Sequence, residues 1–158
     1  LSYNGKRKLI NLLKEHGRVL ITSEEKLPLE FEKYRFHMNP KSMHDYLAFA
    51  DLCISEGATM CSEAAMLGVP SVLVSTLVHG YIKEQRDKYE LVSTFKKEQE
   101  AFKQIQHWLA DPGLHETWKK KRDRMLADKI DLTDWMIDFL NKNFDQTLSS
   151  TASEISHT

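Results

Sequence analysis

The sequence predicts an α/β fold in which helices cover both faces of a parallel β-sheet. Short apolar segments alternate along the chain with amphipathic segments of helical length. This alternation is typical of right-handed crossovers between parallel strands. The 158 residues are enough for one domain with a sizeable core, and 41% hydrophobic and 28% charged residues are ordinary values for a globular protein. No internal repeat interrupts the pattern.

The first third of the chain is expected to contain two helices and two strands. A helix over residues 6–16 ends at Gly17, because glycine readily adopts the backbone angles found after a helix. Strands are expected over 18–23 (RVLITS) and 34–38 (YRFHM), where apolar residues form short runs. A second helix follows over 41–50 (KSMHDYLAFA), with its apolar residues at helical spacing.

The middle of the chain repeats a unit of one strand and one helix. Strands are expected at 51–55, 71–75 and 91–95, with helices at 59–68 and 81–90 between them. Three more amphipathic helices are expected at 98–111, 115–128 and 131–144. The strands of such units lie parallel and side by side, so their carboxyl ends meet at one edge of the sheet.

The predicted domain covers residues 1–144. Residues 145–158 form a polar segment rich in serine and threonine, which predicts a disordered tail. The chain begins with Leu1 rather than methionine and leads directly into a helix. Both features indicate part of a longer protein.

Composition excludes several classes of protein. The net charge of −1, from 22 basic and 23 acidic residues, disfavours nucleic-acid binding, which requires a basic surface. No apolar run approaches the roughly 20 residues of a membrane span, and no signal peptide opens the chain. Cys53 and Cys61 have no CxxC spacing and are typical of small core residues in a reducing compartment. The seven histidines form no close ligand pair. These features predict a cytoplasmic protein without a metal site.

The turn after the strand at 51–55 carries the strongest functional signal. Gly57 allows close approach of a ligand, and Ala58 and Thr59 open a helix whose unpaired N–H groups attract an anion. Glu63 lies one helical turn further along, where its carboxylate can accept two hydrogen bonds from a cis-diol. This spacing fits the diphosphate and the ribose of a nucleotide.

A purely structural interpretation of the same residues stays open. An acidic residue near the start of a helix stabilises it by a few tenths of a kcal/mol without any ligand. Turns with glycine between a strand and a helix are also common in α/β proteins. His44, at the start of a predicted helix, is interpreted as a local packing or capping residue.

The segment EGATMCSEAAMLGVPSVLV resembles the carboxy-terminal domain of GT-B-fold nucleotide-sugar enzymes. It is similar to UDP-N-acetylglucosamine 2-epimerases and to the N-acetylglucosaminyl transferase of peptidoglycan synthesis. The segments ITSE, HDYLAFADL, EGATMCSEAAMLG and DLTDWM also identify the chain as similar to the DUF354 family. The resemblance covers the chain from Lys6 to about Phe144 and implies a Rossmann-like sheet.

The resemblance implies a role for each residue of the turn. Gly57, Ala58 and Thr59 correspond to the diphosphate-binding turn of these enzymes, and Glu63 corresponds to their ribose-binding glutamate. Glu56 stands directly before the turn. An acid there repels phosphate unless it points away or holds a partner of its own.

The resemblance also places the base and the sugar. The base, a uracil, is expected at Met38, Asn39 and Pro40. The sugar is expected at Glu84 and Gln85. From its own position, in a loop at the ligand edge, His79 is a further candidate to contact a phosphate or the sugar, although an exposed loop histidine more often has no such role. No cofactor is implied, because the UDP-sugar is a substrate, and no catalytic residue is assigned.

These enzymes have two Rossmann-like domains with the active site between them. The resemblance therefore implies that the amino-terminal domain and the first strand of this domain are absent from the chain. The resemblance implies the donor-binding half of a metal-independent glycosyltransferase or sugar-nucleotide epimerase. A non-catalytic Rossmann-like module that binds a nucleotide or a protein is the alternative. The exposed sheet edge left by a missing strand favours a homodimer or an unstable fragment.

Overall fold

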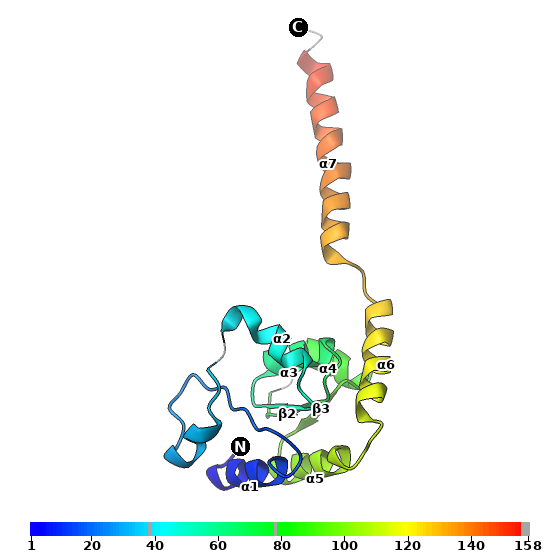
Figure 1. Ribbon diagram of the computed structural model, residues 1–158. Coiled ribbons are helices and arrows are strands. Elements are labelled where there is room, and N and C mark those ends of the chain that lie inside the picture. Colours follow the sequence, from blue (N-terminus) through cyan, green and yellow to red (C-terminus); the bar gives the residue numbers. More distant parts are fainter. Residues whose placement is uncertain (38, 78, 156–158) are drawn as a thin grey trace. The chain divides into compact units, whose positions relative to one another are not determined.

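The computed structural model describes residues 1–37, 39–77 and 79–155 (Figure 1), with side chains through Asn143. The chain divides into two units, residues 1–124 and residues 125–158. The first unit contains the sheet, and the second consists mainly of one long helix. The sequence predicted a single domain that ends at residue 144.

Within the described residues, the first unit is built on a parallel sheet of three strands in the order β1-β2-β3. The strands are β1 (Cys53–Ser55), β2 (Ser71–Val74) and β3 (Val92–Phe95). All four residues of the central strand β2 are buried, as expected for a strand covered on both faces. The predicted α/β class with a parallel, Rossmann-like sheet is confirmed.

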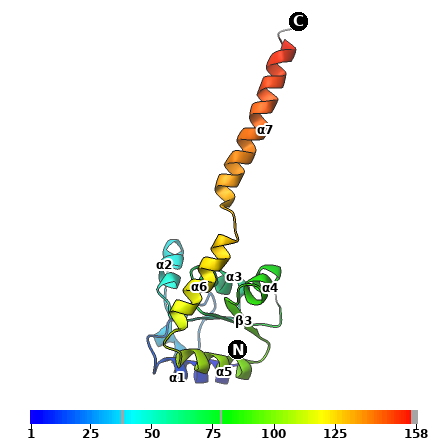
Figure 2. The same cartoon turned by 90° about the vertical axis from the view of Figure 1, so that its right-hand side faces the viewer.

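Helices cover both faces of the sheet (Figures 1 and 2). The crossover helices α3 (Ala58–Met66) and α4 (Gly80–Asp87) lie on one face, where α3 contacts β1 and β2 and α4 contacts β3. The opposite face is covered by α5 (Glu98–Leu109), which contacts β2 and β3, and α1 (Tyr3–Leu13) lies beside α5. Helices on both faces are therefore confirmed.

The two strands predicted before residue 40 are wrong for the described residues. The structure has only a single bridge there, between Ile21 and Arg35, with a 3₁₀ helix η1 (Leu29–Tyr34) between them. The N–H of Ile21 donates to the Tyr34 carbonyl at 2.8 Å, and the N–H of Phe36 donates to the Ile21 carbonyl at 2.9 Å. A strand needs a neighbour along its whole length, and these segments meet at one point only.

Short helices continue the chain toward β1, and one longer helix follows α5. A 3₁₀ turn η2 (Pro40–Ser42) leads into α2 (Met43–Ala48). The helix α6 (Leu114–Ala127) follows α5 after the predicted break around Pro112. These elements match the helices that the sequence predicted in the same places.

The core of the first unit lies between the sheet and its helices. Tyr89, Leu91, Ile82 and Ile105 are almost fully buried. Burial of such side chains stabilises the fold by about 1.5–3 kcal/mol each. The core also contains a buried hydrogen bond just before β3, in which the indole N–H of Trp118 donates to the Leu91 carbonyl at 2.9 Å.

The second unit is dominated by α7 (Leu132–Ile155). Its start is capped by Asp131, whose Oδ1 accepts hydrogen bonds from the N–H groups of Thr133 at 2.9 Å and Asp134 at 3.2 Å. The rings of Trp135 and Phe139, four residues apart, stack at 5.3 Å. The helix extends to Ile155, within the segment 145–158 that the sequence predicted as a polar tail.

Candidate functional site

The predicted diphosphate turn lies at the carboxyl end of β1. Gly57 is the N-cap residue of α3 with φ −100° and ψ 130°, and Ala58 is the first helical residue. These angles are open to any residue, so a special backbone conformation does not explain the glycine. A Cβ atom at Gly57 would meet only the Ser55 Oγ atom, at 3.6 Å. Neither the backbone angles nor the space around this position requires a glycine.

The first turn of α3 presents unpaired donors. No side chain caps this helix, and the first N–H groups of a helix have no acceptor within it. The N–H of Gly57 is already used, because it donates to Ser55 Oγ at 2.9 Å. The remaining donors of this first turn belong to Ala58, Thr59 and Met60, and the positive end of the helix dipole adds to their attraction for an anion.

Glu63, the predicted ribose ligand, lies one turn beyond Thr59 on the same helix. Its side chain is 29% exposed, and its Oε2 atom lies 3.6 Å from the Nε2 atom of His44 on α2. The sequence interpretation of His44 as a local packing residue missed this pairing. No spacing in the sequence signals it, because the two residues meet only when α2 packs on α3.

Glu56, the acid beside the turn, holds partners. The Lys6 ammonium of α1 lies 3.2 Å from its Oε2 atom, and the amino group of Leu1 contacts its Oε1 atom. Burial alone would raise the pKa of Glu56, but the hydrogen bonds from Leu1 and Lys6 hold the pKa below its ordinary value. The ammonium of Lys6 thus offsets part of the negative charge of Glu56 beside the turn.

The start of α1 is tied to the start of α5 at this end of the molecule. The backbone N–H and the hydroxyl of Ser2 donate to the two carboxylate oxygens of Glu98, each at 2.9 Å. The Ser2 hydroxyl also accepts from the N–H of Gly5 at 2.9 Å and so caps α1. These hydrogen bonds lower the pKa of Glu98. Together with the Lys6–Glu56 pair, they hold α1 beside the turn.

The residues predicted to bind the sugar do not form one cluster. His79 is the exposed N-cap residue of α4, and its ring stacks on that of Tyr81 at 5.6 Å. Glu84 is exposed further along α4. Gln85 is only 6% exposed, and its Nε2 atom donates to the Ser62 carbonyl of α3 at 3.3 Å. This hydrogen bond links α4 to α3, whereas the Oε1 atom of Gln85 is buried without a hydrogen-bond partner among the described residues.

The residues predicted to bind the base lie just before α2. Met38 lies outside the described residues. The side chain of Asn39 accepts from the N–H of Lys41 at 3.0 Å and starts η2, in which Pro40 is the first residue. Asn39 and Pro40 are exposed, and the chain runs from them into α2, where His44 meets Glu63.

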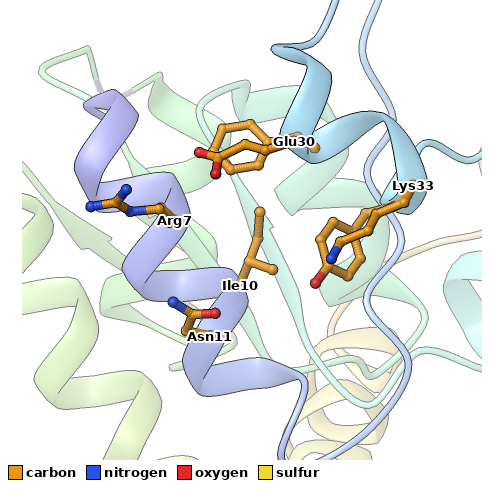
Figure 3. A pocket seen from close by; sticks show the side chains of 7 residues that line it. Arg7, Ile10, Asn11, Glu30 and Lys33 are labelled. Carbon is orange, nitrogen blue, oxygen red and sulfur yellow. The ribbon is translucent and has the colours of Figure 1, made fainter.

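Two cavities of about 240 Å³ lie beside α1 and were not predicted from the sequence. The first opens between α1 and η1, where Arg7 and Asn11 lie across from Glu30 and Lys33 (Figure 3). The second, here called the Lys6 cavity, lies between α1 and the loop before η1. Its lining includes Tyr3, Lys6, Ser23, Glu25, Lys26 and Phe31.

Among the described residues, no group of three histidine, cysteine or acidic side chains could hold a metal ion. None of the described helices is long and apolar enough to cross a bilayer. No protein-family model, no curated protein and no solved structure matches this chain.

Proposed function

We propose that this chain binds a nucleoside diphosphate sugar, with UDP as the nucleotide, and that it is the donor-binding half of a glycosyltransferase or sugar-nucleotide epimerase. The observation that carries the proposal is the uncapped start of α3 at the carboxyl end of β1, with Glu63 one turn further along. Ligands of open parallel sheets bind at this edge.

The charges around the turn support an anionic ligand. The helix start supplies N–H donors, and Lys6 lies beside the turn with its charge shared with Glu56. Glu63 lies one helical turn beyond Thr59, so a nucleotide with its diphosphate on the turn would direct its ribose along α3 toward this carboxylate. Catalysis would then consist of positioning and of electrostatic help to the departing UDP.

The resemblance to GT-B-fold enzymes extends the proposal to a partner. In that arrangement a second Rossmann-like domain of the same protein supplies the acceptor site and the catalytic groups. The alternative is a non-catalytic module that binds a nucleotide or a protein. Product formation from a UDP-sugar by the full-length protein separates the two, because such a module would show no turnover.

Titration calorimetry with UDP on the full chain tests the site. We expect Glu63→Ala to weaken UDP binding by about 1–3 kcal/mol, because the ribose hydroxyls lose a charged acceptor. Glu100→Ala is the matched control, since Glu100 is an exposed carboxylate in the first turn of α5. An unchanged affinity for UDP in the Glu63 variant would show that the ribose assignment is wrong.

A further inference from the structure

The cavity between α1 and η1, here called the Arg7 cavity, has charges of both signs around an apolar floor. Its volume is about 240 Å³, and it is lined by Arg7, Ile10 and Asn11 of α1 and by Glu30, Phe31, Lys33 and Tyr34 of η1. The floor is buried, because Ile10 is 6% and Phe31 is 3% exposed. The charged side chains are exposed, and Figure 3 shows them on different sides of Ile10.

The wall formed by η1 is held in place by contacts within the chain. The guanidinium of Arg35 pairs with Glu32 at 2.7 Å and donates to the Ser23 carbonyl at 3.1 Å, which ties η1 to the loop before it. The ring centroids of Phe31 and Tyr3 lie 5.4 Å apart, so η1 also contacts α1. A cavity that is formed before the ligand arrives lowers the ordering cost of binding.

The opposite charges at the rim do not neutralise one another directly. Among the described residues, no ion pair joins Arg7 or Lys33 to Glu30. Arg7 and Glu30 nevertheless act on the same group, because the hydrogen bond to Glu30 raises the pKa of Tyr3 and the charge of Arg7 opposes this shift. The ammonium of Lys33 lies 5.1 Å from the centroid of the Tyr34 ring. A ligand that carries one group of each charge can therefore bridge the rim.

The chemistry of the lining fits a small zwitterion with an apolar body. The planar guanidinium of Arg7 matches a carboxylate, and the carboxylate of Glu30 has lone pairs for an ammonium group in addition to the Tyr3 hydroxyl. A ligand with only one charge would meet a rim group of its own sign. The volume lies below the roughly 300–1,000 Å³ of pockets for drug-sized ligands, which indicates a small ligand.

We propose that the Arg7 cavity binds a free α-amino acid with an apolar side chain. Its carboxylate pairs with Arg7, its ammonium group pairs with Glu30, and its side chain packs on Ile10 and Phe31 at the floor. Lys33 adds a second positive charge on the carboxylate's side of the balance, which favours this orientation of charge over a simple amine. The inference is independent of the proposed UDP site, because no residue of α3 lines this cavity.

Titration calorimetry on the full chain with L-leucine, L-methionine and L-phenylalanine tests the site. We expect at least one of them to bind. Its analogue without the ammonium group and its analogue without the carboxylate should each bind about tenfold more weakly or worse, since each loses one charged hydrogen bond. For phenylalanine these analogues are 3-phenylpropionate and phenethylamine.

Two variants locate the bound amino acid. Arg7→Met and Glu30→Gln should each weaken binding about tenfold or more. The matched controls are Lys8→Met, which removes an exposed cation of the same helix outside the cavity, and Glu100→Gln on α5. Both controls should leave the affinity unchanged. Circular dichroism melts show that all four variants fold.

Three results would overturn the proposal. If none of the three amino acids binds, the cavity does not take this class of ligand. If an analogue with a single charge binds as tightly as its parent amino acid, the ligand is not recognised as a zwitterion. If an amino acid binds but Arg7→Met and Glu30→Gln leave its affinity unchanged, it binds elsewhere on the chain. None of these results depends on whether the chain binds UDP.

Discussion

The Nε2 atom of His44 lies 3.6 Å from the Oε2 atom of Glu63, so a residue of α2 meets the carboxylate proposed to bind the ribose. Both side chains reach solvent, and an exposed pair of this kind contributes at most about 1 kcal/mol to stability. We expect the imidazole to restrict the positions that the Glu63 carboxylate can take.

We expect His44→Ala to weaken UDP binding about two- to fivefold and to change the free energy of unfolding little, since the pair is exposed. The effect should act through Glu63. Calorimetry on the single variants and on the double variant with Glu63→Ala measures this coupling. Independent, additive effects of the two substitutions would show that His44 does not orient the carboxylate.

Lys6→Met should lower stability at neutral pH by about 0.5 kcal/mol, after allowance for solvent screening of a half-exposed pair. The pKa of folded Glu56 lies below its usual value of 4.5, so the ionised carboxylate stabilises the fold. This contribution is present above about pH 4.5 and is lost as the pH falls through the lower folded pKa. Urea unfolding at pH 7 and pH 3 measures the difference.

The control for that experiment is Lys119→Met, which removes an exposed lysine of α6. It should change the free energy of unfolding by less than the Lys6 variant at pH 7. A loss in the Lys6 variant that persists unchanged at pH 3 would contradict the ion pair as its cause.

Trp118→Phe should destabilise the first unit by about 1–3 kcal/mol. The substitution removes the indole N–H and leaves the Leu91 carbonyl without its donor inside the core. It also replaces the indole by a smaller phenyl ring. The indole packs edge-to-face on Trp108, with the ring centroids 4.7 Å apart. Urea unfolding followed by circular dichroism gives the value.

Trp135→Phe is the matched control, because Trp135 is 50% exposed on α7. Exposed substitutions of this kind usually change stability by no more than about 0.5 kcal/mol. Equal losses in the two tryptophan variants would mean that the hydrogen bond to Leu91 is not the source of the effect.

Cys53 and Cys61 should not react with a thiol reagent in the folded protein. Both are free and buried, and the thiol of Cys61 donates to the Val72 carbonyl at 3.3 Å. The hydrogen bond with Cys53 and burial raise the pKa of Cys61, so little thiolate forms. Ellman's reagent should titrate both thiols only in urea. Rapid reaction of the folded chain at pH 8 would contradict this packing.

The helices and strands predicted from the sequence are present where the hydrophobic pattern of a segment matches its burial in the fold. The apolar run at Ser71–Val74 forms the buried central strand, and the turn at Gly57 starts α3 as expected. The predicted strand at 18–23 fails because a strand depends on a neighbour along its length, which its own residues do not encode.

In the candidate site, too, relationships within one helix were predicted from the sequence, whereas contacts between distant helices were not. Thr59 and Glu63 were predicted as a pair because one helical turn separates them in sequence. The contacts His44–Glu63 and Lys6–Glu56 were missed, since each joins helices that are distant along the chain. The burial of Gln85 was also missed, because an amide that serves helix packing looks the same in sequence as one that faces a ligand.

The amino-acid sequence by itself determined the α/β class, the order of the β1–α3–β2–α4–β3 units and the spacing of the turn from its glutamate. These depend on hydrophobic periodicity and helix geometry, which act over a few neighbouring residues. Tertiary structure alone decided which charges meet at the turn, which amide is buried, and that a cavity opens beside Lys6. Those features depend on how α1 and α2 pack against distant parts of the chain, and packing is a property of the whole fold.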